Sequence, residues 1–196
     1  MVKIKDVVFN GKIHATMYGD FGVGVILCPP HPLFGGSRND FRLVYIARKL
    51  VENGLNALCI DYGSYQHGVG EVQDVLTVIN HLQNFTDKLG LLGYSFGAVV
   101  ASVVSTQTKN IKAVVYMSIL EKVNGLKANL KSKHPKLFIH GKYDTIASYG
   151  VFKKLYDEAE EPKECLILET DHFYTEKMVM ENVSEKICSF FLSKLQ

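Results

Sequence analysis

The stretch LGLLGYSFGAVVA, residues Leu89–Ala101, decides the fold that this sequence predicts. It begins as an apolar run typical of a buried strand and ends in small and apolar residues typical of a packed helix. Between the two parts, Ser95 lies on a sharp turn flanked by Gly93 and Gly97, where strand and helix come too close for a Cβ atom. The amide of Phe96 then lies at a helix N-terminus, which favours an anion. The stretch therefore predicts a strand, a serine hydroxyl that can act as a nucleophile, and a helix.

Apolar runs and amphipathic segments alternate along the rest of the chain. Further buried strands are predicted at residues 22–28, 56–60, 111–117, 136–140 and 164–169. Helices are predicted at residues 39–53, 71–82, 149–159 and 174–195. Residues 3–9 and 12–17 flank Asn10-Gly11, a dipeptide typical of a two-residue turn, and predict an antiparallel hairpin at the sheet edge. The pattern predicts one α/β domain over residues 1–196, with a mostly parallel sheet and helices on both faces.

The composition excludes several classes of function. The chain has 47% hydrophobic residues, 21% charged residues and a net charge of +2, and no basic stripe that could bind nucleic acid. It has neither a signal peptide nor a run of about 18 apolar residues, so we expect a cytoplasmic protein without a membrane partner. No metal-binding or dinucleotide-binding motif is present, so no metal or cofactor is predicted. The cysteines, which lack C-x-x-C spacing, are predicted to be small buried hydrophobic side chains: Cys28, Cys59, Cys165 and Cys188.

Two polar residues that follow later strands are the predicted partners of Ser95. Asp144 follows the strand at 136–140, and His172 follows the strand at 164–169. Because the chemistry of an open parallel sheet collects at the carboxyl ends of its strands, we expect these side chains to meet Ser95. In this arrangement His172 takes the proton of Ser95 and returns it to the leaving group, while Asp144 holds the imidazole tautomer.

Other carboxylates compete with Asp144 for the role of the acid. Glu121 shortly follows the strand at 111–117 and is the rival candidate. Asp171 directly precedes His172, and neighbouring residues in an extended loop point apart, so we expect Asp171 to brace the loop instead.

Four short motifs in a fixed order carry a resemblance to a known family. They are HPLFGG at 31–36, GYSFG at 93–97, HGKYD at 140–144 and DHF at 171–173. With them the chain resembles the α/β-hydrolases, and specifically the small, lidless members related to dienelactone hydrolases and esterase-like proteins. The resemblance implies an eight-stranded, mostly parallel sheet and hydrolysis through a covalent acyl-serine.

The resemblance also assigns the HPLFGG motif to the oxyanion loop. One donor is then the amide of Phe96, and the second is an amide of this loop other than that of Pro32, which has no N–H. By similarity to the His-Gly-x loops of the family, the second donor is expected to be Leu33, with Phe34 as the alternative.

The short, lysine-rich connection between residues 117 and 136 leaves no room for a lid. We therefore expect an open, shallow site with little apolar wall, which favours small or short-acyl esters. Four residues are expected to contact the substrate: His31, Phe34, Tyr94 and Phe173. The sequence predicts a serine carboxylester hydrolase. The same residues would also serve a thioesterase or a small peptidase, and a hydrolase fold can also act as a non-catalytic binding or scaffold protein.

Overall fold

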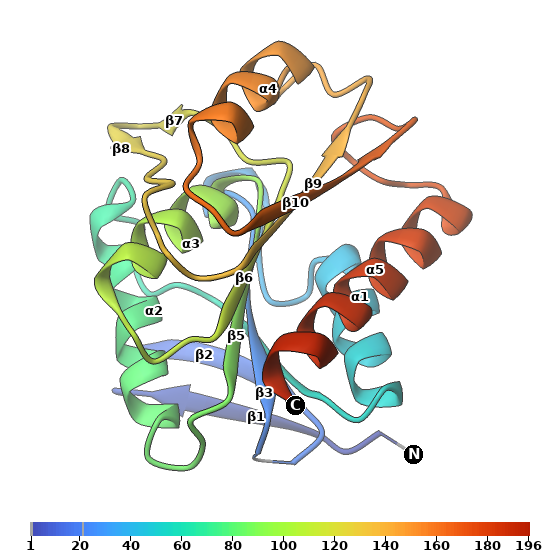
Figure 1. The fold of residues 1–196 in the computed structure, drawn as a ribbon. Coiled ribbons are helices and arrows are strands. Elements are labelled where there is room, and N and C mark those ends of the chain that lie inside the picture. Colours follow the sequence, from blue (N-terminus) through green and yellow to red (C-terminus); the bar gives the residue numbers. More distant parts are fainter. Residues whose placement is uncertain (1, 21) are drawn as a thin grey trace.

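The fold is built on one eight-stranded sheet, seen in a computed structural model that describes residues 2–20 and 22–196 (Figure 1). The strands lie in the order β1-β2-β4-β3-β5-β6-β9-β10. Their bounds are Ile4–Phe9 (β1), Ile13–Tyr18 (β2), Gly24–Cys28 (β3), Asn56–Ile60 (β4), Leu89–Tyr94 (β5), Ala113–Met117 (β6), Lys136–Gly141 (β9) and Lys163–Leu168 (β10). The strands β4, β3, β5, β6, β9 and β10 are parallel to one another, whereas β1 and β2 form the antiparallel edge hairpin. The predicted fold class is confirmed.

The turn of the edge hairpin follows directly from its dipeptide. Asn10 and Gly11 have φ angles of 47° and 68°. Few residues other than asparagine and glycine adopt two successive positive φ angles without strain, and this turn matches the twist of the strands it joins. The dipeptide therefore fixes where β1 ends, and β2 begins one residue later than predicted, after Lys12, because Phe9 pairs with Ile13.

Helices cover both faces of the sheet. They are α1 (Phe41–Glu52), α2 (Val69–Leu82), α3 (Phe96–Gln107), α4 (Tyr149–Glu158) and α5 (Lys177–Leu195). The strand β3 shows the alternation that this requires, since Ile26 packs into a core with α2, α3 and α4, and Leu27 packs into a second core with α1 and α5. Figure 1 shows these two sets of helices on opposite sides of the sheet. Within the described residues, the structure contains no helix that combines the length and the apolar character needed to cross a bilayer.

Two details differ from the sequence prediction. The connection after β6 contains a small antiparallel hairpin, β7 (Lys122–Val123) and β8 (Leu126–Lys127). Cys165 is exposed, whereas the other three cysteines are buried. The prediction for Cys165 is wrong because β10 is the last strand of the sheet and an apolar run does not reveal an edge.

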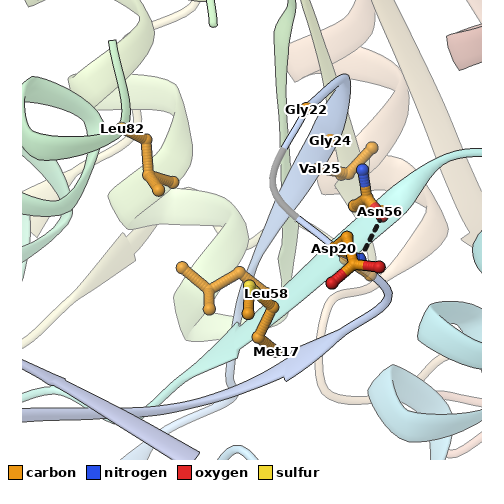
Figure 2. Close-up of a pocket in the computed structure, with 9 residues that line it drawn as sticks. Met17, Asp20, Gly22, Gly24, Val25, Asn56, Leu58 and Leu82 are labelled. Carbon is orange, nitrogen blue, oxygen red and sulfur yellow. Dashed lines mark hydrogen bonds between the residues drawn. The ribbon is translucent and has the colours of Figure 1, made fainter. Parts of the chain in front are cut away.

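Asn56 ties the connection between β2 and β3 to the start of β4. Its Oδ1 accepts a hydrogen bond from the amide of Asp20 at 2.9 Å, and its Nδ2 donates to the carbonyl of Val23 at 3.1 Å. Figure 2 shows Asn56 facing Asp20 beside a small cavity lined by Met17 and Leu58. The cavity measures about 30 Å³, which is about the volume of one water molecule, so it is too small for a substrate.

The turn between β5 and α3 is packed against the end of β3. A Cβ atom at Gly97 would lie 2.3 Å from the carbonyl oxygen of Cys28, and a Cβ atom at Gly93 would lie 2.1 Å from that of Gly97. Both contacts involve backbone atoms, which cannot move aside as a flexible side chain does. The two glycines therefore allow the helix to begin directly behind the strand.

We expect Gly97→Ala to destabilise the fold by about 3 kcal/mol, because its methyl group overlaps the backbone of β3. Urea unfolding measures this change in the free energy of unfolding. Gly150→Ala on α4 is the control, since its Cβ meets no atom within 4 Å and alanine favours a helix by up to about 1 kcal/mol. Equal stability of Gly97→Ala and the wild type would contradict the close packing of the turn.

Candidate active site

Ser95 lies at the tip of the turn between β5 and α3, as the sequence predicts. Its backbone has φ 56° and ψ −117°, an unusual conformation for a residue other than glycine. Its amide donates to the carbonyl of Met117 at 2.9 Å, which ties the turn to the end of β6. The side chain is buried, with the residue 7% exposed. The turn thus holds the hydroxyl at the carboxyl edge of the sheet.

His172 and Asp144 meet Ser95 at this edge. The Nε2 atom of His172 lies 3.0 Å from Ser95 Oγ, and its Nδ1 atom lies 2.7 Å from Asp144 Oδ2. The three side chains come from the ends of β5, β9 and β10, and all three residues are buried. Residues up to 77 positions apart therefore form one continuous hydrogen-bonded chain.

Asp144 is held in its ionised form. Burial opposes ionisation, but hydrogen bonds from His172, from the amide of Ala147 and from Ser118 hold the pKa of the Asp144 carboxyl below its usual value. The Oδ1 atom accepts from the amides of Ile146 and Ala147 at 2.9 and 2.7 Å. Ionised Asp144 can only accept from Nδ1 of His172, so the tautomer that satisfies this contact leaves Nε2 free to accept the proton of Ser95.

Ser118 supports Asp144 and was not predicted. Its hydroxyl donates to Asp144 Oδ2 at 2.9 Å and shares a hydrogen bond of 2.7 Å with the hydroxyl of Tyr174. Ser118 directly follows β6 and has a φ of 47°. The sequence signal was its place at the carboxyl end of a strand, but a single serine there is too common to single out.

Tyr94 and Arg42 hold the turn that carries His172 through hydrogen bonds to its backbone carbonyls. The hydroxyl of Tyr94 donates to the carbonyl of His172 at 2.8 Å, and Nη1 of Arg42 donates to the carbonyl of Phe173 at 3.1 Å. The guanidinium lies 4.4 Å from the centre of the Tyr94 ring and pairs with Asp40. Neither Arg42 nor Asp40 was predicted, because at the start of a helix they resemble an ordinary cap and a surface cation.

The two competing carboxylates have other partners. Glu121 pairs with Lys154 at 3.0 Å. Asp171 Oδ1 accepts from the amide of Phe173 at 2.8 Å, which braces the loop. Asp144 is therefore the carboxylate that reaches His172.

A cavity of about 460 Å³ is lined in part by Ser95. It is lined by all four residues that the sequence assigned to substrate contact, His31, Phe34, Tyr94 and Phe173. Further apolar lining that was not predicted comes from Leu120, Val123 and Ile146. The prediction of a shallow site with little apolar wall is wrong, because the connection after β6 folds into a hairpin that adds a wall.

The loop after β3 does not present the amide of Leu33 to the cavity. That amide donates to Nδ1 of His31 at 3.2 Å, and the side chain of Leu33, 66% exposed, does not line the cavity. Burial lowers the pKa of His31, so its ring is neutral and can accept this hydrogen bond. The amide of the alternative donor, Phe34, donates to the carbonyl of His31 at 3.0 Å. The expectation for Leu33 therefore fails, because residues 32–34 form a 3₁₀ turn that uses these amides internally.

Among residues 2–20 and 22–196, no three histidine, cysteine, aspartate or glutamate side chains are grouped so that they could hold a metal ion.

Comparisons with known proteins agree with this architecture. An α/β serine hydrolase homologue from Coxiella burnetii superposes with a TM-score of 0.82, 21% identity and 96% coverage of both chains. An esterase from Pyrococcus furiosus superposes with a TM-score of 0.82 and 16% identity over 100% of this chain and 92% of that chain. At these identities the likeness shows a shared fold.

Sequence comparison adds a relative and a family. An uncharacterised protein of Rickettsia prowazekii is 40% identical over 84 residues, which are 37% of this chain and 34% of that protein, so the chain matches about a third of the relative's length. Residues 63–163 match the sequence pattern of the dienelactone hydrolase family, and they include both Ser95 and Asp144. Because this match covers just over half of the chain, which has the α/β-hydrolase fold described above, the protein belongs to the dienelactone hydrolase family.

Proposed function

We propose that this protein is a serine hydrolase that cleaves carboxylic esters through an acyl-serine intermediate. The observation that carries the proposal is the chain of hydrogen bonds from Ser95 through His172 to Asp144, with distances of 3.0 and 2.7 Å. A serine hydroxyl is a weak nucleophile unless a base within hydrogen-bond reach takes its proton, and this chain supplies that base.

The reaction runs in two halves. His172 takes the proton of Ser95 as Oγ attacks the ester carbonyl, and the protonated imidazole then gives this proton to the departing alcohol. A water molecule next attacks the acyl-serine while His172 takes its proton. The bond between the acyl carbon and Oγ then breaks, His172 returns the proton to Ser95 Oγ, and the carboxylic acid is released. Asp144 keeps its negative charge throughout and stabilises the imidazolium of each step.

Two backbone amides stabilise the oxyanion in this proposal. One is the amide of Phe96 at the N-terminus of α3, where the helix dipole also favours a negative charge. The second is the amide of His31, which replaces Leu33. In the loop at 29–36, three residues are prolines without an N–H, and the amides of Leu33, Phe34, Gly35 and Gly36 donate to acceptors of the loop itself. His31 follows two prolines, and its amide is the one in this loop that has no hydrogen-bond acceptor among residues 2–20 and 22–196.

The pair His31→Pro and His31→Ala tests the second donor. Both variants lack the imidazole, but only the proline variant lacks the amide hydrogen, and the φ of −61° at His31 suits proline. We expect kcat for p-nitrophenyl acetate to be about 10²- to 10³-fold lower in His31→Pro than in His31→Ala, which is the effect of removing one oxyanion donor. Equal kcat values in two folded variants would exclude this amide.

A fluorophosphonate probe tests the proposed function as a whole. We expect it to label Ser95, in the tryptic peptide between Lys88 and Lys109, and to stop the hydrolysis of p-nitrophenyl acetate. Fragment ions separate Ser95 from Ser102 and Ser105 in the same peptide. A panel of acetyl esters, acetyl thioesters and acetyl anilides separates an esterase from a thioesterase or a peptidase. Absence of both labelling and turnover would instead favour a non-catalytic role.

A further inference from the structure

Part of the apolar wall beside Ser95 comes from the connection between β6 and β9. Leu120 and Val123 line the cavity from the connection after β6, and Phe34 lines it from the loop after β3. The cavity of about 460 Å³ corresponds to about fifteen water molecules, which is far more space than an acetyl group fills. Phe34 is 88% exposed, so its ring extends this apolar surface from the cavity to the mouth. We call the surface formed by Phe34, Leu120 and Val123 the hairpin cleft.

The hairpin cleft is pre-formed, because the β7–β8 hairpin is anchored to the loop after β3. At the tip of the hairpin, Nδ2 of Asn124 donates to the hydroxyl of Tyr65. The same hydroxyl accepts from Nε2 of His31 at 3.2 Å, because Nδ1 of this neutral ring already accepts from the amide of Leu33. The ring of His31 in turn packs against the ring of Phe34, with 4.9 Å between ring centres. Tyr65 and His31 thus link the two walls of the cleft.

The charged residues of the cavity leave the hairpin cleft neutral. Asp40 and Arg42 line the cavity, but they pair with each other, and Arg42 makes a further hydrogen bond to the carbonyl of Phe173. A buried charge that is already paired with an opposite charge does not attract a charged substrate. It also adds no desolvation cost when an apolar substrate binds beside it. The cleft therefore offers its ligand apolar contact and exclusion of water.

From these observations we infer that the hairpin cleft binds the acyl chain of the substrate, and that the preferred substrates are uncharged esters of medium-chain carboxylic acids rather than acetate esters. The inference rests on the proposed function. His172 protonates the leaving alcohol, so the alcohol lies on the side of His172 and Phe173. The acyl chain then lies on the side of His31 and Phe96, whose ring centres are 4.9 Å apart. The tip of the hairpin is anchored on this side.

A series of p-nitrophenyl esters, kept below the concentrations at which they aggregate, tests the inference. Each methylene group that is transferred fully out of water raises the binding constant by about fourfold. Where this binding energy is also present in the transition state, it raises kcat/KM. We therefore expect kcat/KM to be at least about tenfold higher for the octanoate than for the acetate.

Two substitutions locate the chain in the hairpin cleft. Val123→Phe fills the cleft, and we expect it to lower the ratio of octanoate to acetate kcat/KM at least tenfold. Val8→Phe is the matched control, because Val8 is a half-exposed residue on β1 at the far edge of the sheet, and it should leave the ratio and both rates unchanged. Asn124→Ala, which releases the hairpin tip without filling the cleft, should lower the same ratio and so supports the assignment if Val123→Phe does not fold.

The failure of this inference is distinguishable from the failure of the proposed function. Hydrolysis of the acetate together with a flat chain-length profile, or an unchanged ratio in folded Val123→Phe, would overturn the acyl assignment and leave the esterase in place. A loss of octyl acetate hydrolysis in Val123→Phe, with the octanoate unaffected, would place the alcohol in the cleft and also overturn the assignment. No turnover of any ester would refute the proposed function itself.

Discussion

Replacing Ser95 by alanine should lower kcat for p-nitrophenyl acetate by about four to six orders of magnitude, because it removes the atom that forms the covalent intermediate in the proposed mechanism. The Oγ atom of Ser95 is the end of the hydrogen-bonded chain, 3.0 Å from His172. The fold should persist, since alanine fills the same space at the turn. Steady-state kinetics measure the loss of kcat, and circular dichroism checks the fold.

The control for this substitution is Ser189→Ala. Ser189 lies on α5 and is exposed, so the same chemical change there should leave kcat unchanged. Residues that act as one unit give strongly non-additive effects. We therefore expect kcat of the double variant Ser95→Ala/His172→Ala to lie within a few-fold of kcat of Ser95→Ala alone. Activity of Ser95→Ala close to the wild type would refute the mechanism.

Asp144→Asn should lower kcat by about 10⁴-fold while keeping the size of the side chain. The Oδ1 position accepts from the amides of Ile146 and Ala147, so the amide oxygen of the new residue is needed there. Its NH₂ group then faces His172 and donates to Nδ1, which forces the proton of the imidazole onto Nε2. An imidazole with a proton on Nε2 cannot accept the proton of Ser95, so the base is lost.

The same substitution predicts a pH dependence of stability. The folded-state pKa of Asp144 is lowered, so its ionised form stabilises the fold above the ordinary aspartate pKa of about 4, and this contribution is lost as the pH falls through the folded-state value. The difference in the free energy of unfolding between wild type and Asp144→Asn should therefore be larger at pH 7 than at pH 3, as measured by urea unfolding. Asp87→Asn, an exposed position, should show no such difference. A difference that grows toward pH 3 would contradict the ionised state of Asp144.

Much of the fold is predictable because its elements are short and locally specified. The dipeptide Asn10-Gly11 can form few turns other than the one observed, and Gly93 and Gly97 are required by a backbone contact that larger residues cannot make. The alternation of buried strands and helices then allows few topologies. The boundaries of elements shift by one to three residues, as at α5, which begins at Lys177 and not at 174.

The features that sequence reasoning missed depend on contacts between distant segments. Ser118 becomes a partner of Asp144 only because β6 and β9 are neighbours in the sheet. Similarity to the family favours Leu33, but the amide of Leu33 donates to the ring of His31. A local hydrogen bond of this kind depends on the rotamer of the histidine. The β7–β8 hairpin has strands of two residues each, which is too short for a periodic signal.

The most direct test of the central claim is to trap the covalent intermediate. The protein is mixed with p-nitrophenyl octanoate, quenched with acid within the first turnovers, digested with trypsin and analysed by mass spectrometry. We predict that the peptide between Lys88 and Lys109 carries one octanoyl group on Ser95, and that the acyl group is absent from Ser95→Ala. Turnover of the ester with no acyl group on Ser95, or with the acyl group on another residue, would contradict the account.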